Sequence, residues 1–175
     1  VMIRQLDILA LEPFYGGARR IMLEKLIQHS RHRWTLLKLP PRRIERRLSA
    51  AAHWFAEQLS RHWVGRVDLL FTSEALNLSD LHRFTPQLRQ KPSVVYFHSN
   101  QLPYAQNEND SPLDLVNLNT ATAASEIWFN SLFHLRVFMA KVTAMVQRHS
   151  ELSSRDPMSS LQNKSVVMYP PIASD

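Results

Sequence analysis

Cysteine is absent from this 175-residue chain, and glycine occurs only three times. Without cysteine the fold can contain no disulfide and no thiolate metal site, and a reducing, cytoplasmic compartment fits such a composition best. There is also no apolar run of about 18 residues, so a membrane-spanning helix is not expected. The N-terminus lacks a charged segment followed by a hydrophobic block, so we expect a soluble protein that is not exported.

The length of the chain limits how many domains it can form. With 45% apolar residues, 175 residues can bury one substantial core and are too few for two. The sequence has no internal repeat and no low-complexity tract. We therefore expect residues 1–175 to form a single domain.

Short apolar runs alternate with helical patterns along the chain. The runs that predict strands lie at 6–11, 35–39, 67–71, 93–97, 126–129 and 165–169. Apolar residues spaced by three or four predict helices around 21–27, 44–63, 79–83, 113–124 and 132–147, and 150–163 is expected to be a loop. Strands that are buried on both faces lose their polar alternation. The pattern therefore predicts a doubly wound, Rossmann-like α/β fold with a parallel sheet.

Polar residues flank the predicted helices and suggest how they begin. Ser79 precedes the third helix, and Asn130 and Ser131 precede the last one. Their side chains can accept hydrogen bonds from the first free backbone N–H groups of a helix. We expect them to act as N-caps. Trp34, Trp54, Trp63 and Trp128 fall within apolar patterns, so we assign them to the core.

Positive charge is concentrated in one region. Ten lysines and arginines stand against two glutamates between Arg19 and Arg47, a net +8, whereas the remaining residues sum to −2 of the total +6. Four of these cations, Arg42, Arg43, Arg46 and Arg47, begin the helix predicted at 44–63. Cations at a helix N-terminus oppose the helix dipole, which favours a phosphate-binding role over a merely solvated helix face. Long cationic side chains that cover apolar neighbours are the alternative.

Polar residues recur where the predicted strands end, and ligands bind at the carboxyl edge of such sheets. Gly16 and Gly17 lie between the first strand and its helix, where backbone N–H groups can approach a phosphate. Arg19 and Arg20 follow them and add positive charge. No G-x-G-x-x-G fingerprint is present, so an ordinary tight turn is the competing interpretation.

A second group of polar residues follows the strand at 93–97, in the stretch Tyr96-Phe-His-Ser-Asn-Gln-Leu-Pro-Tyr104. The side chains of His98, Asn100 and Gln101 can donate and accept hydrogen bonds, which suits sugar hydroxyls or base edges. We favour a binding site here over a loop that satisfies only its own backbone.

Carboxylates at strand ends are the remaining candidates for acid–base chemistry. Glu12 and Glu74 could serve if burial raised their pKa values, although such residues are more often hydrogen-bond acceptors in loops. The sequence has no G-x-S-x-G nucleophile motif, and the other seven histidines show no metal-binding spacing. We therefore predict no metal site.

Four motifs together resemble a known family. Read in chain order, they are Glu12-Pro-Phe-Tyr-Gly-Gly17, Ser73-Glu-Ala-Leu-Asn-Leu-Ser-Asp-Leu81, Tyr96-Phe-His-Ser-Asn-Gln-Leu-Pro-Tyr104 and Phe129-Asn-Ser-Leu-Phe-His134. They are similar to the N-terminal domain of the tRNA-queuosine α-mannosyltransferases, which are related to family-four, GT-B glycosyltransferases. The resemblance implies transfer of mannose from GDP-mannose to queuosine in a tRNA anticodon, with retention at the anomeric carbon. It implies no metal and no cofactor beyond the donor substrate.

The resemblance also assigns roles to particular residues. It implies that Gly16 and Gly17 lie against the donor diphosphate and that the catalytic His98 faces the transferred sugar. Asn100, Gln101, Asn130 and Ser131 would line the cleft. Charge alone adds Arg19 as a further substrate-binding residue and the arginines at 42–47 as contacts to the tRNA backbone.

The sequence departs from the family pattern at two places. Ala18-Arg19 stands where the family usually has Ser-His, and Ser99 stands where it usually has Glu. The paired glutamates, eight positions apart, of a GT-B nucleotide-binding domain are also missing. We therefore expect an acceptor-side half that does not catalyse transfer without a C-terminal nucleotide-sugar domain. A noncatalytic nucleic-acid-binding domain and a glycosyltransferase with another acceptor are the alternatives.

Overall fold

The computed structural model describes residues 4–99, 114–148 and 157–171. Six strands form one parallel sheet in the order β2-β1-β3-β4-β5-β6. Their bounds are β1 (Asp7–Glu12), β2 (Arg33–Lys38), β3 (Leu69–Ser73), β4 (Ser93–Phe97), β5 (Glu126–Phe129) and β6 (Ser165–Val167). The predicted α/β, Rossmann-like class is confirmed.

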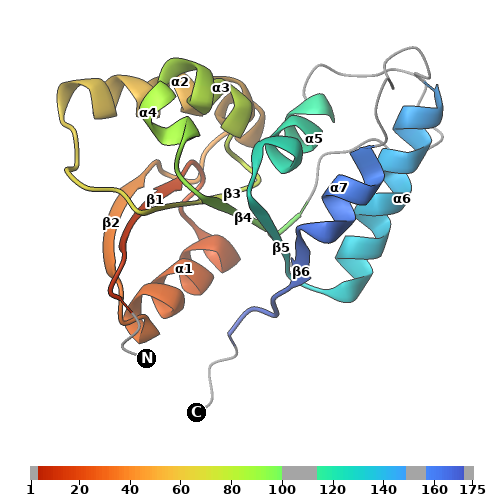
Figure 1. Cartoon of the computed structure of the whole chain (residues 1–175), viewed down its shortest axis with the longest axis horizontal. Coiled ribbons are helices and arrows are strands. Elements are labelled where there is room, and N and C mark those ends of the chain that lie inside the picture. Colours follow the sequence, from red (N-terminus) through yellow and green to blue (C-terminus); the bar gives the residue numbers. More distant parts are fainter. Residues whose placement is uncertain (1–3, 100–113, 149–156, 172–175) are drawn as a thin grey trace.

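Helices connect the strands, and Figure 1 shows them on both faces of the sheet. They are α1 (Gly17–His29), α2 (Ile44–Arg61), α3 (Leu78–Phe84), α4 (Pro86–Arg89), α5 (Asp114–Ala123), α6 (Leu132–Arg148) and α7 (Pro157–Asn163). The two faces are covered unequally. The larger core cluster joins one face to side chains of α2 through α7, whereas the smaller cluster joins the other face to α1.

The burial of each element follows from its sequence pattern. All five residues of β4 are buried, as expected for a continuous apolar run in the middle of a sheet, whereas the edge strand β2 has no buried residue. In α2, Leu48, Ala52, Phe55 and Leu59 lie three or four positions apart and are buried. The apolar stripe of α2 thus fixes this helix on the sheet.

Several predicted boundaries differ from the structure. Asn77, not Ser79, caps α3, because the Asn77 side chain accepts a hydrogen bond from the backbone N–H of Asp80, while the Ser79 hydroxyl donates to the Asn119 carbonyl. Part of the expected loop at 150–163 is the helix α7, whose Leu161 is buried in the larger core cluster. The short helix α4, which begins at a proline, was not predicted.

Smaller differences concern strand ends and tryptophans. β3 begins at Leu69, two residues later than predicted, and β6 ends at Val167 rather than at residue 169. Trp63 lies beyond the end of α2 and is 44% exposed, so its assignment to the core was wrong. The other three tryptophans pack, partly buried, against the two core clusters.

The strand order reverses beside β1. The chain passes from β1 to β2 on one side and then to β3 on the other side of β1. The connections that leave β1 and β3 therefore diverge from the carboxyl ends of these two strands, the place where open α/β sheets generally bind ligands. The segments that follow β1, β3 and β4 all begin at this edge.

Candidate functional site

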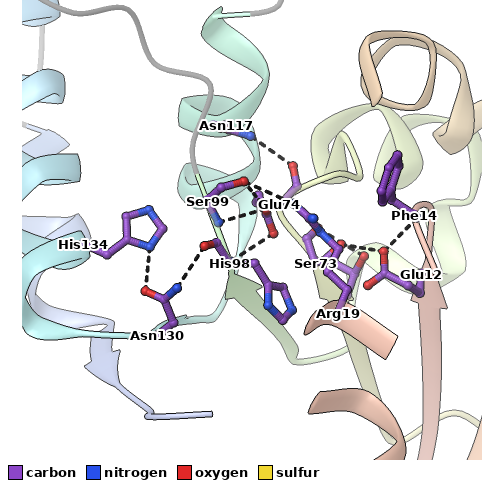
Figure 2. A network of polar contacts seen from close by, with 11 residues as sticks. Glu12, Phe14, Arg19, Ser73, Glu74, His98, Ser99, Asn117, Asn130 and His134 are labelled. Atoms are coloured by element: carbon purple, nitrogen blue, oxygen red, sulfur yellow. Dashed lines mark hydrogen bonds and ion pairs between the residues drawn. The ribbon is translucent and has the colours of Figure 1, made fainter. Parts of the chain in front are cut away.

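A connected group of polar side chains lies where β1, β3 and β4 end (Figure 2). Glu12 is the last residue of β1, Glu74 directly follows β3, and His98 directly follows β4. Arg19 joins them from the first turn of α1. The prediction that these distant segments converge at one edge of the sheet is confirmed by direct contacts between them.

Glu74 is the centre of this group, and it is 1% exposed. Its carboxylate accepts hydrogen bonds from the backbone N–H of His98 at 3.2 Å and from the backbone N–H and hydroxyl of Ser99 at 3.1 and 2.9 Å. The Arg19 guanidinium forms an ion pair with the same carboxylate. Asn117 on α5 donates to the Glu74 main-chain carbonyl at 3.0 Å. Glu74 therefore holds the backbone that carries His98 in one conformation.

Glu12 is the second buried carboxyl group, 3% exposed. It accepts hydrogen bonds from the backbone N–H of Phe14 at 2.8 Å and from the Ser73 hydroxyl at 3.0 Å. Burial raises the pKa of Glu12 to about 7; the hydrogen bond from Phe14 opposes the rise, and the negative charge of Glu74 adds to it. Near neutral pH this carboxyl group is therefore divided between its protonated and ionised forms.

Arg19 connects the turn after β1 with the turn after β4. Its Nη2 donates to the Ser99 hydroxyl at 3.2 Å, and its guanidinium lies 5.5 Å from the centre of the Phe14 ring. Its Nε is buried without a partner in the part of the chain that the structure describes. Two of the three residues that depart from the family pattern, Arg19 and Ser99, are thus in contact with each other.

Gly16 and Gly17 occupy the turn that leads into α1, and each has its own structural reason to be glycine. Gly17 has φ +54, which strains residues with a Cβ atom. At Gly16 a Cβ atom would meet Pro41 Cγ at 2.5 Å. The turn is thus packed against the loop that precedes α2. The predicted role of both glycines at a diphosphate stays a prediction.

His98 lies beside this cluster, and its ring packs on Tyr96 with the ring centres 4.5 Å apart. The pKa of His98 is lowered to about 4. Burial is the main cause and the positive charge of Arg19 adds to it, whereas the negative charge of Glu74 opposes it. The imidazole is therefore neutral at physiological pH. Among the interactions of the described residues, none is a hydrogen bond to a His98 ring nitrogen, and no dashed line reaches the ring in Figure 2. The neutral ring is free to hydrogen-bond a ligand.

The turn after β5 supports His98 from the other side. The Asn130 side chain donates to the His98 main-chain carbonyl at 2.9 Å, and its Oδ1 lies 3.0 Å from His134 Nδ1. The Ser131 hydroxyl accepts from the backbone N–H of His134 at 3.1 Å, which confirms Ser131 as the N-cap of α6. Both side chains are thus engaged within the protein. Their role in lining a substrate cleft stays a prediction, and Asn100 and Gln101 lie outside the described residues.

The arginines at the start of α2 lie near the same edge, because Pro41 packs on Gly16 and immediately precedes them. Arg42, Arg43 and Arg46 are exposed, and none of their side chains forms a hydrogen bond or ion pair within the described ranges. Arg47 donates to the Pro40 carbonyl at 3.2 Å. Arg43 has φ 51, a left-handed conformation that is unfavourable for a residue with a side chain. Local stability does not explain this concentration of charge, which supports a role in binding.

Sequence patterns missed part of this site. No sequence pattern indicates a functional role for His134, Ser73 or Asn117, although all three contribute to the hydrogen bonds around Glu12, Glu74 and Asn130 (Figure 2). Ser73 and His134 lie inside the quoted motifs, so the motif boundaries were the available signal. Asn117 lies in a helix and carries no such signal.

Within the described residues no group of three or more histidines and carboxylates could hold a metal ion.

The family model for the N-terminal domain of tRNA-queuosine alpha-mannosyltransferase matches residues 7–172. The chain belongs to this family. A tRNA-queuosine alpha-mannosyltransferase from Drosophila melanogaster is 30% identical over 169 residues, which are 94% of this chain and 44% of that protein. The chain thus spans less than half the length of this relative.

Solved structures give more distant likenesses. The crystal structure of Arabidopsis thaliana UGT89C1 with UDP-L-rhamnose has a TM-score of 0.43 and 15% identity over 76% of this chain and 46% of that chain. A yeast Spc42 trimeric coiled-coil segment fused to another structure has a TM-score of 0.39 and 12% identity over 93% and 91%. Neither likeness bears on what this chain does.

No helix in the described part is both long and apolar enough to cross a membrane.

Proposed function

We propose that this chain is the acceptor-side half of a retaining glycosyltransferase that transfers mannose from GDP-mannose to queuosine in a tRNA anticodon. Family membership supports a transferase of this kind. The assignment of the site depends on His98. Its imidazole is neutral and its ring nitrogens are unengaged, and contacts to its backbone from both sides hold it at the carboxyl edge of the sheet.

The local chemistry suits a sugar ligand. A neutral imidazole can donate one hydrogen bond and accept another, which suits a hydroxyl group of the transferred sugar or of the acceptor. Its backbone N–H and carbonyl are fixed by Glu74 and Asn130, so little conformational entropy is lost when the ring meets a ligand. Holding reacting groups in position in this way accounts for a large part of the activation free energy that an enzyme can remove.

The remaining parts of the edge would meet the phosphate groups of the two substrates. Gly16, Gly17 and Arg19 would face the donor diphosphate, and the exposed arginines at the start of α2 would contact the tRNA backbone. During transfer the bond between the anomeric carbon and the diphosphate oxygen breaks and GDP departs. The acceptor hydroxyl forms the new glycosidic bond and passes its proton to the departing diphosphate oxygen. The nucleotide part of the donor would be held by a C-terminal domain of the full-length protein. A cytoplasmic setting suits a chain without cysteine.

The test uses the full-length protein with GDP-mannose and queuosine-containing tRNA. Mass spectrometry of the digested tRNA should reveal mannosyl-queuosine, and the His98→Ala variant should reduce its rate of formation by about 10²-fold or more. His29→Ala is the matched control, because His29 is exposed at the end of α1 and makes no contact with the cluster. Thermal unfolding should be similar for both variants. Normal turnover by His98→Ala would remove His98 from the mechanism, and wild-type protein without mannosyl transfer would refute the function.

A different acceptor is the second candidate, and the contact between Arg19 and Ser99 favours it. Both residues replace the usual family residues, and they meet at the place where the family pattern puts a histidine and a glutamate. Altered polarity at this spot would alter which hydroxyl group is accepted. Transfer of mannose to tRNA that lacks queuosine, at a rate equal to that with queuosine, would support this candidate over the first.

A further inference from the structure

A hollow of 630 Å³ lies at the other end of the sheet from the Glu74 cluster. It is lined by Ser79, His82, Arg83, Pro86, Arg89 and Ala123, which belong to α3, α4 and the last turn of α5. Arg89 precedes the start of β4 by four residues, and Ala123 precedes the start of β5 by three. The hollow therefore lies towards the amino ends of these strands, whereas Glu74 and His98 lie at the carboxyl ends. Figure 1 shows α3 and α5 beside each other above the sheet.

The lining of the hollow has an excess of positive charge. Arg83 and Arg89 are both exposed, and neither forms a side-chain hydrogen bond or ion pair in the described part of the chain. None of the six lining residues is acidic. The nearest carboxylate along α3, that of Asp80, accepts a hydrogen bond from the Asn77 amide at 2.7 Å. Two guanidinium groups therefore share one hollow, and no carboxylate of the described residues pairs with either of them.

His82, the histidine that lines the hollow, is affected by the same excess of positive charge. His82 Nε2 is buried and lacks a partner within the described ranges. Its pKa is lowered by burial and then by the positive charge of Arg89, so the two side chains are close enough to interact electrostatically. An anion bound beside Arg89 would cancel that charge. The pKa of His82 should therefore rise when an anion binds in the hollow.

The position of each arginine on its helix accounts for only part of this arrangement. Arg83 is in the last turn of α3 and Arg89 in the last turn of α4, where a cation is favourable beside free carbonyl groups. That effect favours one cation on each helix separately. It does not require both to line one hollow whose described lining residues include no carboxylate.

We propose that this hollow binds a phosphate-bearing ligand, with Arg83 and Arg89 donating hydrogen bonds to phosphate oxygens. Guanidinium groups match the geometry of phosphate and bind it through parallel hydrogen bonds. The volume falls within the range of roughly 300 to 1,000 Å³ that holds small organic ligands, so a phosphate group with an attached organic part fits better than a bare ion. The phosphate can come from a free phosphate monoester or from the backbone of an RNA strand. The site is separate from the edge proposed for sugar transfer and does not depend on that function.

The first experiment follows the His82 ring resonances of the chain by NMR during titration with inorganic phosphate, with chloride at equal ionic strength as the reference. Bound phosphate should raise the pKa of His82 beyond the effect of chloride, because it neutralises Arg89. Arg83→Gln and Arg89→Gln should each weaken binding about tenfold. Arg31→Gln should not weaken binding, because Arg31 is exposed in the loop between α1 and β2 and its replacement removes the same charge away from the hollow.

A second titration with a short single-stranded RNA distinguishes the two sources. If RNA binds through this hollow, each arginine substitution should lower the dependence of log affinity on log salt by about 0.7. A response to phosphate with no such change for RNA identifies a small phosphate ester as the ligand. The proposal is overturned if neither probe affects His82 beyond chloride, or if Arg83→Gln and Arg89→Gln behave like Arg31→Gln. Sugar transfer by the full-length variants is a separate measurement, so its failure would not be mistaken for failure of this site.

Discussion

The replacement Glu12→Gln should make the protein more stable at high pH than at low pH, relative to wild type. Glutamine has the shape of a protonated glutamic acid, and its carbonyl oxygen can still accept the hydrogen bonds from Phe14 and Ser73. What the variant cannot do is ionise. The comparison therefore isolates the cost of placing a negative charge at this buried position.

The size of the effect follows from the pKa of Glu12. In the folded protein it is raised from 4.5 to about 7, so the folded state binds the proton more tightly than the unfolded state does. Stability is therefore highest at low pH and decreases as the pH rises from about 4.5 to about 7. At about 1.4 kcal/mol for each factor of ten in proton affinity, the full loss is roughly 3 kcal/mol. Between about pH 5 and about pH 8 it amounts to 2 to 3 kcal/mol.

Urea unfolding of both proteins at these two pH values measures the prediction. The variant should gain about 2 to 3 kcal/mol over wild type on going from the lower to the higher pH. Other carboxyl groups contribute equally to both proteins and cancel in the difference. Glu45→Gln is the control, because Glu45 is exposed at the start of α2 and its replacement removes the same formal charge without changing a buried group. Parallel stability curves for wild type and Glu12→Gln would refute the reasoning.

Two further predictions concern the same edge of the sheet. Gly16→Ala should destabilise the protein by about 1 to 3 kcal/mol in urea unfolding, because the new Cβ would overlap Pro41, and an unchanged midpoint would contradict the close approach. Arg19→Met and Glu74→Gln should each cost about 3 to 5 kcal/mol, because either leaves its partner buried without full compensation. The double variant should lose less than the sum of the two, by at least about 1 kcal/mol, and simple additivity would show that the two groups do not interact.

The sequence predicted the central part of the fold well because local signals and packing agree there. β4 and β5 have the predicted bounds, since apolar runs bordered by polar residues are recognisable without knowledge of their neighbours. α7 was missed because its sequence is mostly polar, and Leu161 reveals its importance only by its burial in the core. Asn77 and Ser79 are both good N-caps, and the choice between them depends on the path of the loop after β3.

The candidate site was predicted as a set of positions but not as a set of interactions. Parallel strands place their carboxyl ends at one edge, so the sequence sufficed to bring the turns after 6–11, 67–71 and 93–97 to the same side. It did not indicate that Glu74 would accept hydrogen bonds from the backbone of His98 and Ser99. It also gave His134 no role, because a lone histidine in a helix has no recognisable pattern.

The sequence by itself determined the six strands and most of the helices, and therefore which residues lie at the carboxyl edge of the sheet, because hydrophobic periodicity is a local property. Only the tertiary structure decided that Arg19 contacts Ser99, 80 residues away, and that the pKa of Glu12 is raised to about 7. Hydrogen bonds and pKa values depend on the atoms and water that surround a group. In this protein those surroundings are set by the order of the strands in the sheet, which places β1 beside β3 and β3 beside β4.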